Sequence, residues 1–185
     1  MLKRTLLVVL SFVSLVILAP YVVVAVPTIS APFVTVGVGD TFTIPISIVD
    51  ATELASWQFD LAFNPSIVQA NSVTEGPFLS SSGTKLTLFT PGVIDNVGGQ
   101  ITLVADLFVD LLPGPSGSGD LADIEFTALA AGVSPFTLSN VFLNGLDSGF
   151  EIGNGAVAAV PEPATLLLLG GGLALLGGRR LAKRR

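Results

Sequence analysis

The sequence predicts an all-β fold, a sandwich or jelly roll of about nine short strands set between two apolar chain ends. In the middle of the chain, apolar residues alternate with polar ones, which is the period of a half-buried strand. Gly, Pro, Asn and Asp residues that favour turns separate these alternating segments at short intervals. No convincing amphipathic-helix period occurs outside the two ends. Short strands at such spacing are typical of sandwiches and jelly rolls.

The clearest strands lie at 41–49 and 56–63. One face of the first carries Phe42, Ile44, Ile46 and Ile48, and one face of the second carries Trp57, Phe59, Leu61 and Phe63. We expect Trp57, Phe59, Leu61, Ile46 and Phe126 in the core. Pro45 lacks a backbone N–H, so its strand should lie at a sheet edge or turn that nitrogen away from a neighbour. Further strands are predicted at 33–38, 67–72, 85–90, 100–108, 121–129, 135–139, 141–143 and 156–160.

The strand pattern continues on both sides of a Pro-, Gly- and Ser-rich stretch at 113–119. We therefore interpret this stretch as a loop inside one domain, which spans residues 33–158. A domain of that size can bury a sufficient core without disulfides.

The N-terminus has the pattern of a secretory signal peptide, predicted for residues 1–25. Lys3 and Arg4 precede an apolar run, and small residues follow it. Ala25 is a plausible cleavage point and Ala31 is another. The alternative is an uncleaved N-terminal anchor, and in either case the domain is exported.

The C-terminus, residues 160–185, combines an extended motif, an apolar helix and a basic end. Val160, Pro161, Glu162 and Pro163 come first, and the two prolines favour extended backbone. Residues 164–178 carry no charge, and their fifteen positions make a helix of about 22 Å, short of the roughly 30 Å hydrocarbon core. Flanking residues can close that gap. The basic residues Arg179, Arg180, Lys183, Arg184 and Arg185 predict a cytoplasmic end for this transmembrane helix.

Composition excludes several function classes. The 185-residue chain has no Cys and no His, which excludes a Ser-His-Asp triad, a thiol nucleophile and a metal site built on these residues. Residues 26–162 contain one lysine, Lys85, against fourteen acidic residues, a net charge of −13. A domain so anionic repels phosphate backbones, so we expect no nucleic-acid partner.

The candidate groups for metal binding or catalysis in the domain are carboxylates. Asp120 and Asp123 beside the Gly-rich loop form a weak candidate for calcium, which takes oxygen ligands, and we expect no other cofactor. Asp123 and Glu125 share a strand face about 7 Å apart, which a glycoside hydrolase could use. Their alternation with apolar residues favours a solvated face instead. The Ser-rich run before Lys85 is interpreted as a loop, and we predict no catalytic residue.

Two resemblances extend this interpretation. The Pro-Glu-Pro motif at 161–163, the apolar helix and the Arg-rich end resemble the PEP-CTERM sorting signal, which implies processing by an exosortase. The segments at 38–42, 57–68, 119–132 and 138–141 resemble, in order and spacing, the cohesin module of cellulosome scaffoldins. That resemblance implies a nine-stranded jelly-roll sandwich, and a protein partner of dockerin type.

The leading hypothesis is a non-enzymatic, exported interaction module. An exosortase would process the inner-membrane-anchored precursor, and the mature form would reach the cell surface or the exopolysaccharide matrix. The alternative is a carbohydrate-binding module for polysaccharide, and a glycoside hydrolase is a weaker one. The only Trp, Trp57, is in phase with core residues, and the only Tyr, Tyr21, lies in the export signal, so the aromatic platform that stacks on sugars is missing.

Overall fold

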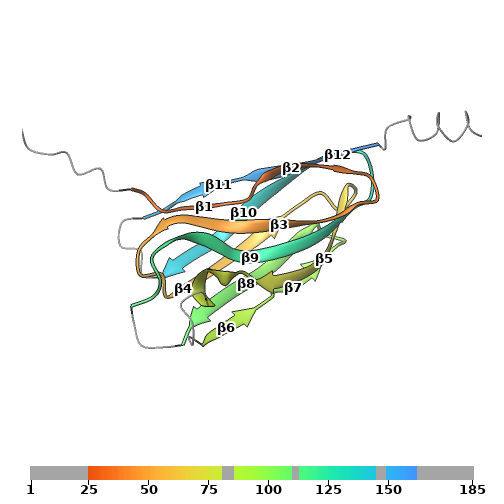
Figure 1. The fold of residues 1–185 in the computed structure, drawn as a ribbon. Coiled ribbons are helices and arrows are strands. Elements are labelled where there is room, and N and C mark those ends of the chain that lie inside the picture. The colour runs from red at the N-terminus through yellow and green to blue at the C-terminus, as the bar shows by residue number, and fades with distance from the viewer. Residues whose placement is uncertain (1–24, 81–85, 110–112, 145–148, 162–185) are drawn as a thin grey trace, which may run out of the picture.

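The computed structural model describes residues 25–80, 86–109, 113–144 and 149–161. They form two β-sheets packed face to face, with one short helix (Figure 1). The elements of the first half are β1 (Thr28–Ser30), β2 (Phe33–Gly37), β3 (Thr41–Ala51), β4 (Ser56–Ala62), β5 (Val68–Glu75) and α2 (Pro77–Ser80). Those of the second half are β6 (Thr87–Thr90), β7 (Val93–Asp95), β8 (Gln100–Phe108), β9 (Gly117–Ala128), β10 (Gly132–Asn144), β11 (Glu151–Gly153) and β12 (Gly155–Val160).

Within these residues, one sheet has five strands in the order β11-β1-β3-β9-β5. The other has seven, in the order β2-β12-β10-β4-β8-β6, with β7 also paired to β8. Most neighbours are antiparallel, but β1 runs parallel to β11 and β2 runs parallel to β12. The prediction of an all-β sandwich is therefore confirmed, with twelve strands in the described part of the chain rather than about nine.

The differences from the predicted strands are local. Three strands were not predicted, β1, β7 and β11, and each has only three residues. The segments predicted at 135–139 and 141–143 are one strand, β10, whose pairing with β4 shifts register between Ser139 and Phe142. Strand β9 begins at Gly117, inside the stretch predicted to be a loop, so the loop expectation is wrong for Gly117–Gly119.

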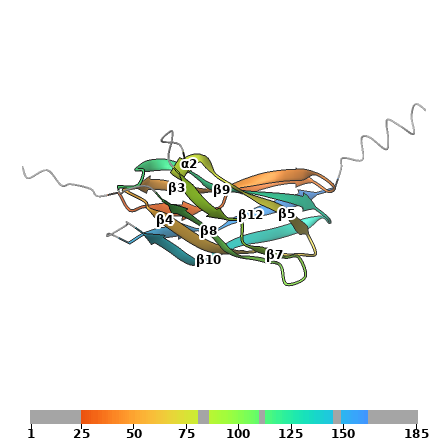
Figure 2. The same cartoon turned by 90° about the horizontal axis from the view of Figure 1, so that it is seen from below.

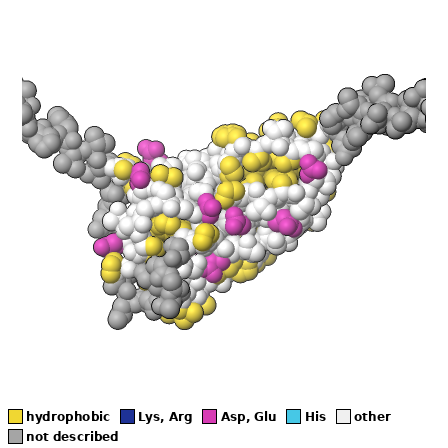
Figure 3. All heavy atoms as spheres, viewed as in Figure 1, with side chains coloured by type: hydrophobic (Ala, Val, Ile, Leu, Met, Phe, Trp, Pro, Cys, Tyr) yellow, Lys and Arg dark blue, Asp and Glu magenta, His cyan; other side chains and the backbone are white. Residues whose placement is uncertain are grey.

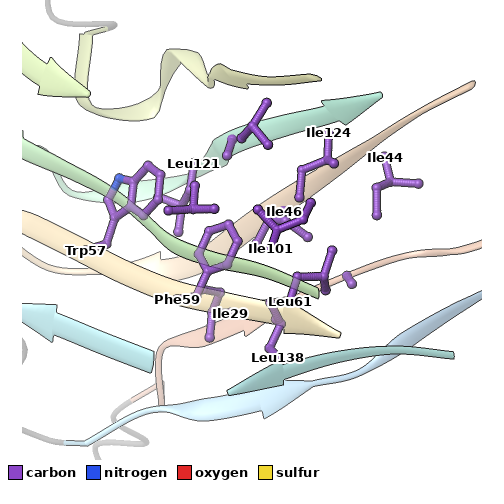
Figure 4. Close-up of a cluster of buried hydrophobic side chains, with 14 of the residues drawn as sticks. Ile29, Ile44, Ile46, Trp57, Phe59, Leu61, Ile101, Leu121, Ile124 and Leu138 are labelled. Carbon is purple, nitrogen blue, oxygen red and sulfur yellow. The ribbon is translucent and has the colours of Figure 1, made fainter. Parts of the chain in front are cut away.

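The core lies between the sheets and is built from the predicted faces (Figure 4). Trp57, Phe59, Leu61, Ile46 and Phe126 are all at most 1% exposed, which confirms their predicted burial. Trp57 stacks on Phe59 with ring centroids 5.5 Å apart. Complete burial of aromatic side chains from both sheets supplies the main stabilising contribution in a domain without disulfides.

Pro45 lies in a strand that is internal to its sheet, since β3 has β1 on one side and β9 on the other. Strand β1, however, pairs only with Ser47, Ile48 and Val49 of β3, while Pro45 pairs with Asp123 of β9. The edge expectation is thus wrong for the strand as a whole. At Pro45 itself, only the β9 side of the strand has a ladder partner within the described sheet.

The described chain enters and leaves the sandwich at opposite ends (Figures 1 and 2). Thr28 pairs with Val49 near one end of β3. At the other end, the N–H of Val38, just before β3, donates to the carbonyl of Val160 at 2.9 Å. Eleven residues of β3 span about 36 Å at the usual strand rise, which sets the separation of the two ends.

Candidate interaction surface

The outward face of the seven-stranded sheet carries large exposed apolar side chains. Strand register places Leu88, Leu107 and Ser56 in one cross-strand row, and Ala105, Gln58 and Phe142 in the next. We call this surface the β8 face and define it by Leu88, Leu103, Leu107, Phe142, Gln58 and Asp60. Leu103 is 51% exposed and Phe142 is 56% exposed, whereas their inward neighbours on the same strands are buried. Contiguous exposed apolar side chains of this kind mark interaction sites.

Two β-bulges shape the centre of the β8 face. The β4–β8 ladder shifts register between Phe59 and Leu61, and the β4–β10 ladder shifts between Ser139 and Phe142. Each bulge contains a residue in the left-handed region, Leu103 at φ 59° and Asn140 at φ 49°. A left-handed leucine is costly for an L-amino acid, so other contacts must hold it in place.

Asp60 of β4 lies between the two bulges and binds both. Its Oδ1 accepts a hydrogen bond from the N–H of Leu103 at 2.7 Å, and its Oδ2 accepts one from Nδ2 of Asn140 at 2.6 Å. Both carboxylate oxygens are therefore engaged within the domain. The centre of the β8 face presents apolar side chains around a carboxylate that already has two donors.

The outward face of the five-stranded sheet has the opposite character. Many of its side chains are hydroxyls, amides and carboxylates, and Figure 3 shows acidic groups spread over this face with apolar patches between them. Asn71 donates from Nδ2 to Glu125 at 3.2 Å and to Thr127 at 2.9 Å. No Lys, Arg or His occurs among the described residues, so this face is anionic without internal counter-charges.

The predicted calcium pair lies on this polar face. A register shift in the β3–β9 ladder between Ile46 and Ser47 breaks the alternation between Asp120 and Asp123. Asp120 accepts a hydrogen bond from Ser47 Oγ at 2.6 Å. Burial first, and the charge of Asp120 second, raise the pKa of Asp123. In the part of the chain that the structure describes, no three acidic, His or Cys side chains form a group that could hold a metal. The calcium site stays a prediction that rests on these two carboxylates.

The core also contains a carboxylate whose burial was not predicted. Asp106 is 2% exposed and pairs across the sheet with Trp57 and Phe89. Its Oδ1 accepts the N–H of Leu107 at 2.9 Å, whereas its Oδ2 and Trp57 Nε1 have no hydrogen-bond partner. Burial raises the pKa of Asp106 to about 6, and the charge of Glu75 adds to the effect. Its burial could have been predicted from the alternation of the strand, because Asp106 falls on the same face of β8 as the apolar residues Val104 and Phe108.

The predicted sorting motif begins where the sheet ends. Val160 is the last residue of β12 and pairs with Gly37, and Pro161 follows it exposed to solvent. Glu162, Pro163 and the basic residues 179–185 lie outside the described residues, as does the predicted signal peptide up to residue 24. Among the residues that are described, no helix is long and apolar enough to cross a membrane.

Solved structures resemble this fold across most of their length. A non-cellulosomal cohesin from the archaeon Archaeoglobus fulgidus superimposes with a TM-score of 0.57 at 19% identity, over 74% of this chain and 92% of that one. The second type II cohesin module of the ScaA scaffoldin of Acetivibrio cellulolyticus gives a TM-score of 0.60 at 15% identity, over 76% of this chain and 99% of that one. The third cohesin of ScaC from the same organism was solved in complex with the ScaB dockerin. It gives a TM-score of 0.56 at 14% identity, over 72% of this chain and 99% of that one.

Family models match two parts of the chain. No curated protein matches it closely enough to add to this comparison. The model of the PEP-CTERM protein-sorting motif matches residues 159–185, and this motif indicates an exported protein sorted to the envelope. The model of the cohesin domain, a non-catalytic interaction module, matches residues 27–154. The chain therefore belongs to the cohesin family, and a PEP-CTERM motif follows its cohesin domain.

Proposed function

We propose that this protein is a non-enzymatic cohesin module that binds a dockerin-type protein domain through its β8 face. The observation that carries the proposal is the set of large exposed apolar side chains on the β8 face, while acidic groups are spread over the opposite sheet. Cohesins of similar fold have been solved as complexes with dockerins, which supports a protein partner of that type. Desolvating an apolar surface favours association, whereas desolvating unpaired carboxylates opposes it.

The polar centre of the β8 face is compatible with burial by a partner. Because both oxygens of Asp60 already have donors, the partner need not supply a counter-charge for it. Leu107 lies directly opposite Leu88 across the β6–β8 ladder, and the cross-strand row that contains Phe142 is the next one along the sheet. Leu107 therefore lies near the middle of the apolar side chains of the β8 face. Central apolar anchors of this kind contribute most to binding.

Matched charge substitutions test the assignment of the face. The full-length protein is used to isolate partners from the producing cells, and affinity is then measured for Leu107→Glu and for Gln69→Glu on the opposite sheet. Both side chains are exposed, and Gln69 lies opposite the uncharged Thr127, so both variants should have the melting temperature of the wild type. We expect Leu107→Glu to weaken binding at least tenfold, about 1.4 kcal/mol, and Gln69→Glu to leave it unchanged. Equal affinities for the two variants would exclude the β8 face.

The carbohydrate-binding alternative is tested in parallel on a glycan array. Trp57 is 1% exposed, and the described residues include no Tyr, so an aromatic platform for sugar stacking is absent from them. Saturable binding to a polysaccharide would favour this alternative over a protein partner.

The sorting proposal concerns the C-terminal segment. An exosortase would recognise the Pro-Glu-Pro motif while residues 164–178 hold the precursor in the inner membrane, and would release the domain to the surface or matrix. The match to the sorting motif and the exposure of Pro161 at the end of β12 support accessibility to such an enzyme. The five terminal basic residues would fix the orientation, because moving them into lipid is costly.

Replacing Pro161 and Pro163 with Ala should leave export intact and block processing, so that uncut protein accumulates in the inner membrane. Mass spectrometry of the mature protein from its own host provides the direct measurement. A wild-type C-terminus that still ends in Arg185 would show that the segment is only an anchor.

A further inference from the structure

The end of the sandwich at which the chain leaves for the C-terminal segment is apolar. We define this apolar tip by Val38, Leu129, Ala130, Ala131, Val133 and Val160. Backbone hydrogen bonds hold its segments in place: Val38 N–H donates to the carbonyl of Val160 at 2.9 Å, and Leu129 N–H donates to the carbonyl of Ile67, outside the tip, at 2.7 Å. Strand register places Val133 opposite Ala158, two residues before Val160.

The tip is exposed despite its composition. Val133 is 62% exposed, and Leu129 and Val160 are exposed by more than two fifths. The connection between β9 and β10 runs Leu-Ala-Ala, whereas connections on a protein surface are usually built from polar turn residues. No described element covers these side chains. Packing inside the domain therefore does not explain why apolar residues occur at these positions.

Carboxylates at this end are turned toward the backbone. Asp40, in the turn before β3, accepts the N–H of Gly37 at 2.7 Å. Asp95, in the turn before β8, accepts the N–H groups of Val97 and Gly98 at 2.9 Å each, which lowers its pKa. The opposite end of the sandwich differs, because Asp50, Glu53 and Glu151 are exposed there, and Glu151 lies directly opposite Thr28 in the β1–β11 ladder.

Chain length ties the tip to the proposed membrane segment. Three residues, 161–163, separate Val160 from Ala164, the first residue of the uncharged run, and they reach about 10 Å when fully extended. The headgroup layer on each side of the hydrocarbon core is about 5–7 Å thick. The end of the domain that carries Val160 can therefore lie no more than a few ångströms above the headgroup layer.

We propose that the apolar tip rests in the headgroup layer of the membrane that holds residues 164–178 in the uncut protein. This inference rests on the proposed membrane insertion of that segment. Contact by a few small apolar side chains is too weak to hold a domain on a bilayer alone, since even a single myristoyl chain binds only marginally. The tip therefore acts only while the tether is intact: it holds the Pro-Glu-Pro motif at the surface, and cleavage frees the domain.

Site-specific fluorescence tests the proposal. The chain has no Cys, so single substitutions carry one environment-sensitive fluorophore each. Full-length Ala131→Cys, Thr52→Cys at the far end, and Leu175→Cys in the tail are reconstituted in vesicles of phosphatidylethanolamine and phosphatidylglycerol containing spin-labelled lipid. We expect quenching at position 131 by headgroup spin labels to exceed that at position 52 at least threefold, and position 175 to be quenched by acyl-chain spin labels.

The outcomes separate the two proposals. Quenching at position 175 with equal, low quenching at 131 and 52 would overturn the tip contact and leave membrane insertion standing. Absence of quenching at 175 would overturn insertion, and the tip contact with it. In the Ala131→Cys background, Leu129→Glu with Val133→Glu should lower the quenching by at least half while the melting temperature stays unchanged. Unaltered quenching in that folded variant would show that tethering alone brings the tip to the lipid.

Discussion

Asp60 provides the most direct test of how the β8 face is built. In Asp60→Asn the side chain keeps its shape but has one acceptor oxygen, and its new amide group faces a donor, either Leu103 N–H or Asn140 Nδ2. One of the two hydrogen bonds is lost, and the other loses the carboxylate charge. The left-handed conformation of Leu103 then has one support fewer.

The size of the effect follows from these contacts. A hydrogen bond to a charged group contributes about 1.5–3 kcal/mol. Because this site is open to water, we take the lower end, about 1.5 kcal/mol, and add about 0.5 kcal/mol for the weakened second bond. Asp60→Asn should therefore lower the free energy of unfolding by about 2 kcal/mol, and Asp60→Ala by about 3 kcal/mol, since it loses both bonds.

Equilibrium unfolding in urea measures this loss. With a slope of about 2 kcal/mol per molar urea, the midpoint of Asp60→Asn should fall by about 1 M. Glu125→Gln is the matched control, because Glu125 accepts a single bond from Asn71 at 3.2 Å on the other face, and its midpoint should move by less than about 0.25 M. If Asp60→Asn shifts no more than this control, the carboxylate does not hold the bulges.

Three further predictions address the core and the carboxylates. Trp57→Ala should cost about 3–5 kcal/mol in urea unfolding, as deletions of buried aromatic side chains do, and a cost below about 1 kcal/mol would contradict its place in the core. The raised pKa of Asp106, about 6, means that the folded protein binds this proton more tightly than the unfolded one, so its contribution to stability is full below pH 3.8 and is lost as pH rises to about 6. Asp106→Asn should therefore be more stable than the wild type at pH 7 and match it near pH 3, and a difference that does not change with pH would refute this. The domain should fold in chelator, and a melting temperature that rises steeply with millimolar calcium would instead reveal a site at Asp120 and Asp123.

The long alternating segments were predictable because their signal is local. Strand β4 has the expected inward face of Trp57, Phe59 and Leu61, and all three are buried. Strands β1, β7 and β11 could not be predicted, since three residues show no period. Strands β1 and β11 also form only by pairing with partners distant in the sequence. Propensity and pattern carry little information about such pairings.

The candidate surface was harder to predict than the fold. Leu103 and Asn140 leave the strand period because of bulges, and a bulge depends on the register of two strands at once. Asp60 lies 43 residues from Leu103 and 80 from Asn140, so no local motif reveals the contact. The sorting motif, in contrast, is a contiguous segment, and the family model matches it where the sequence placed it.

The separation of the chain's entry and exit points has a consequence for how a partner would be held at the envelope. The strands run between the two ends, and the β8 face lies along their flank rather than at either end (Figures 1 and 2). While the tail remains uncut, a partner on that flank would be held beside the domain, within about 36 Å of the anchoring surface. With one such flank per copy, we expect each molecule to recruit a single partner. The number of partners at the envelope would then follow the surface density of uncut precursor, and cleavage would turn membrane-held pairs into freely tumbling ones.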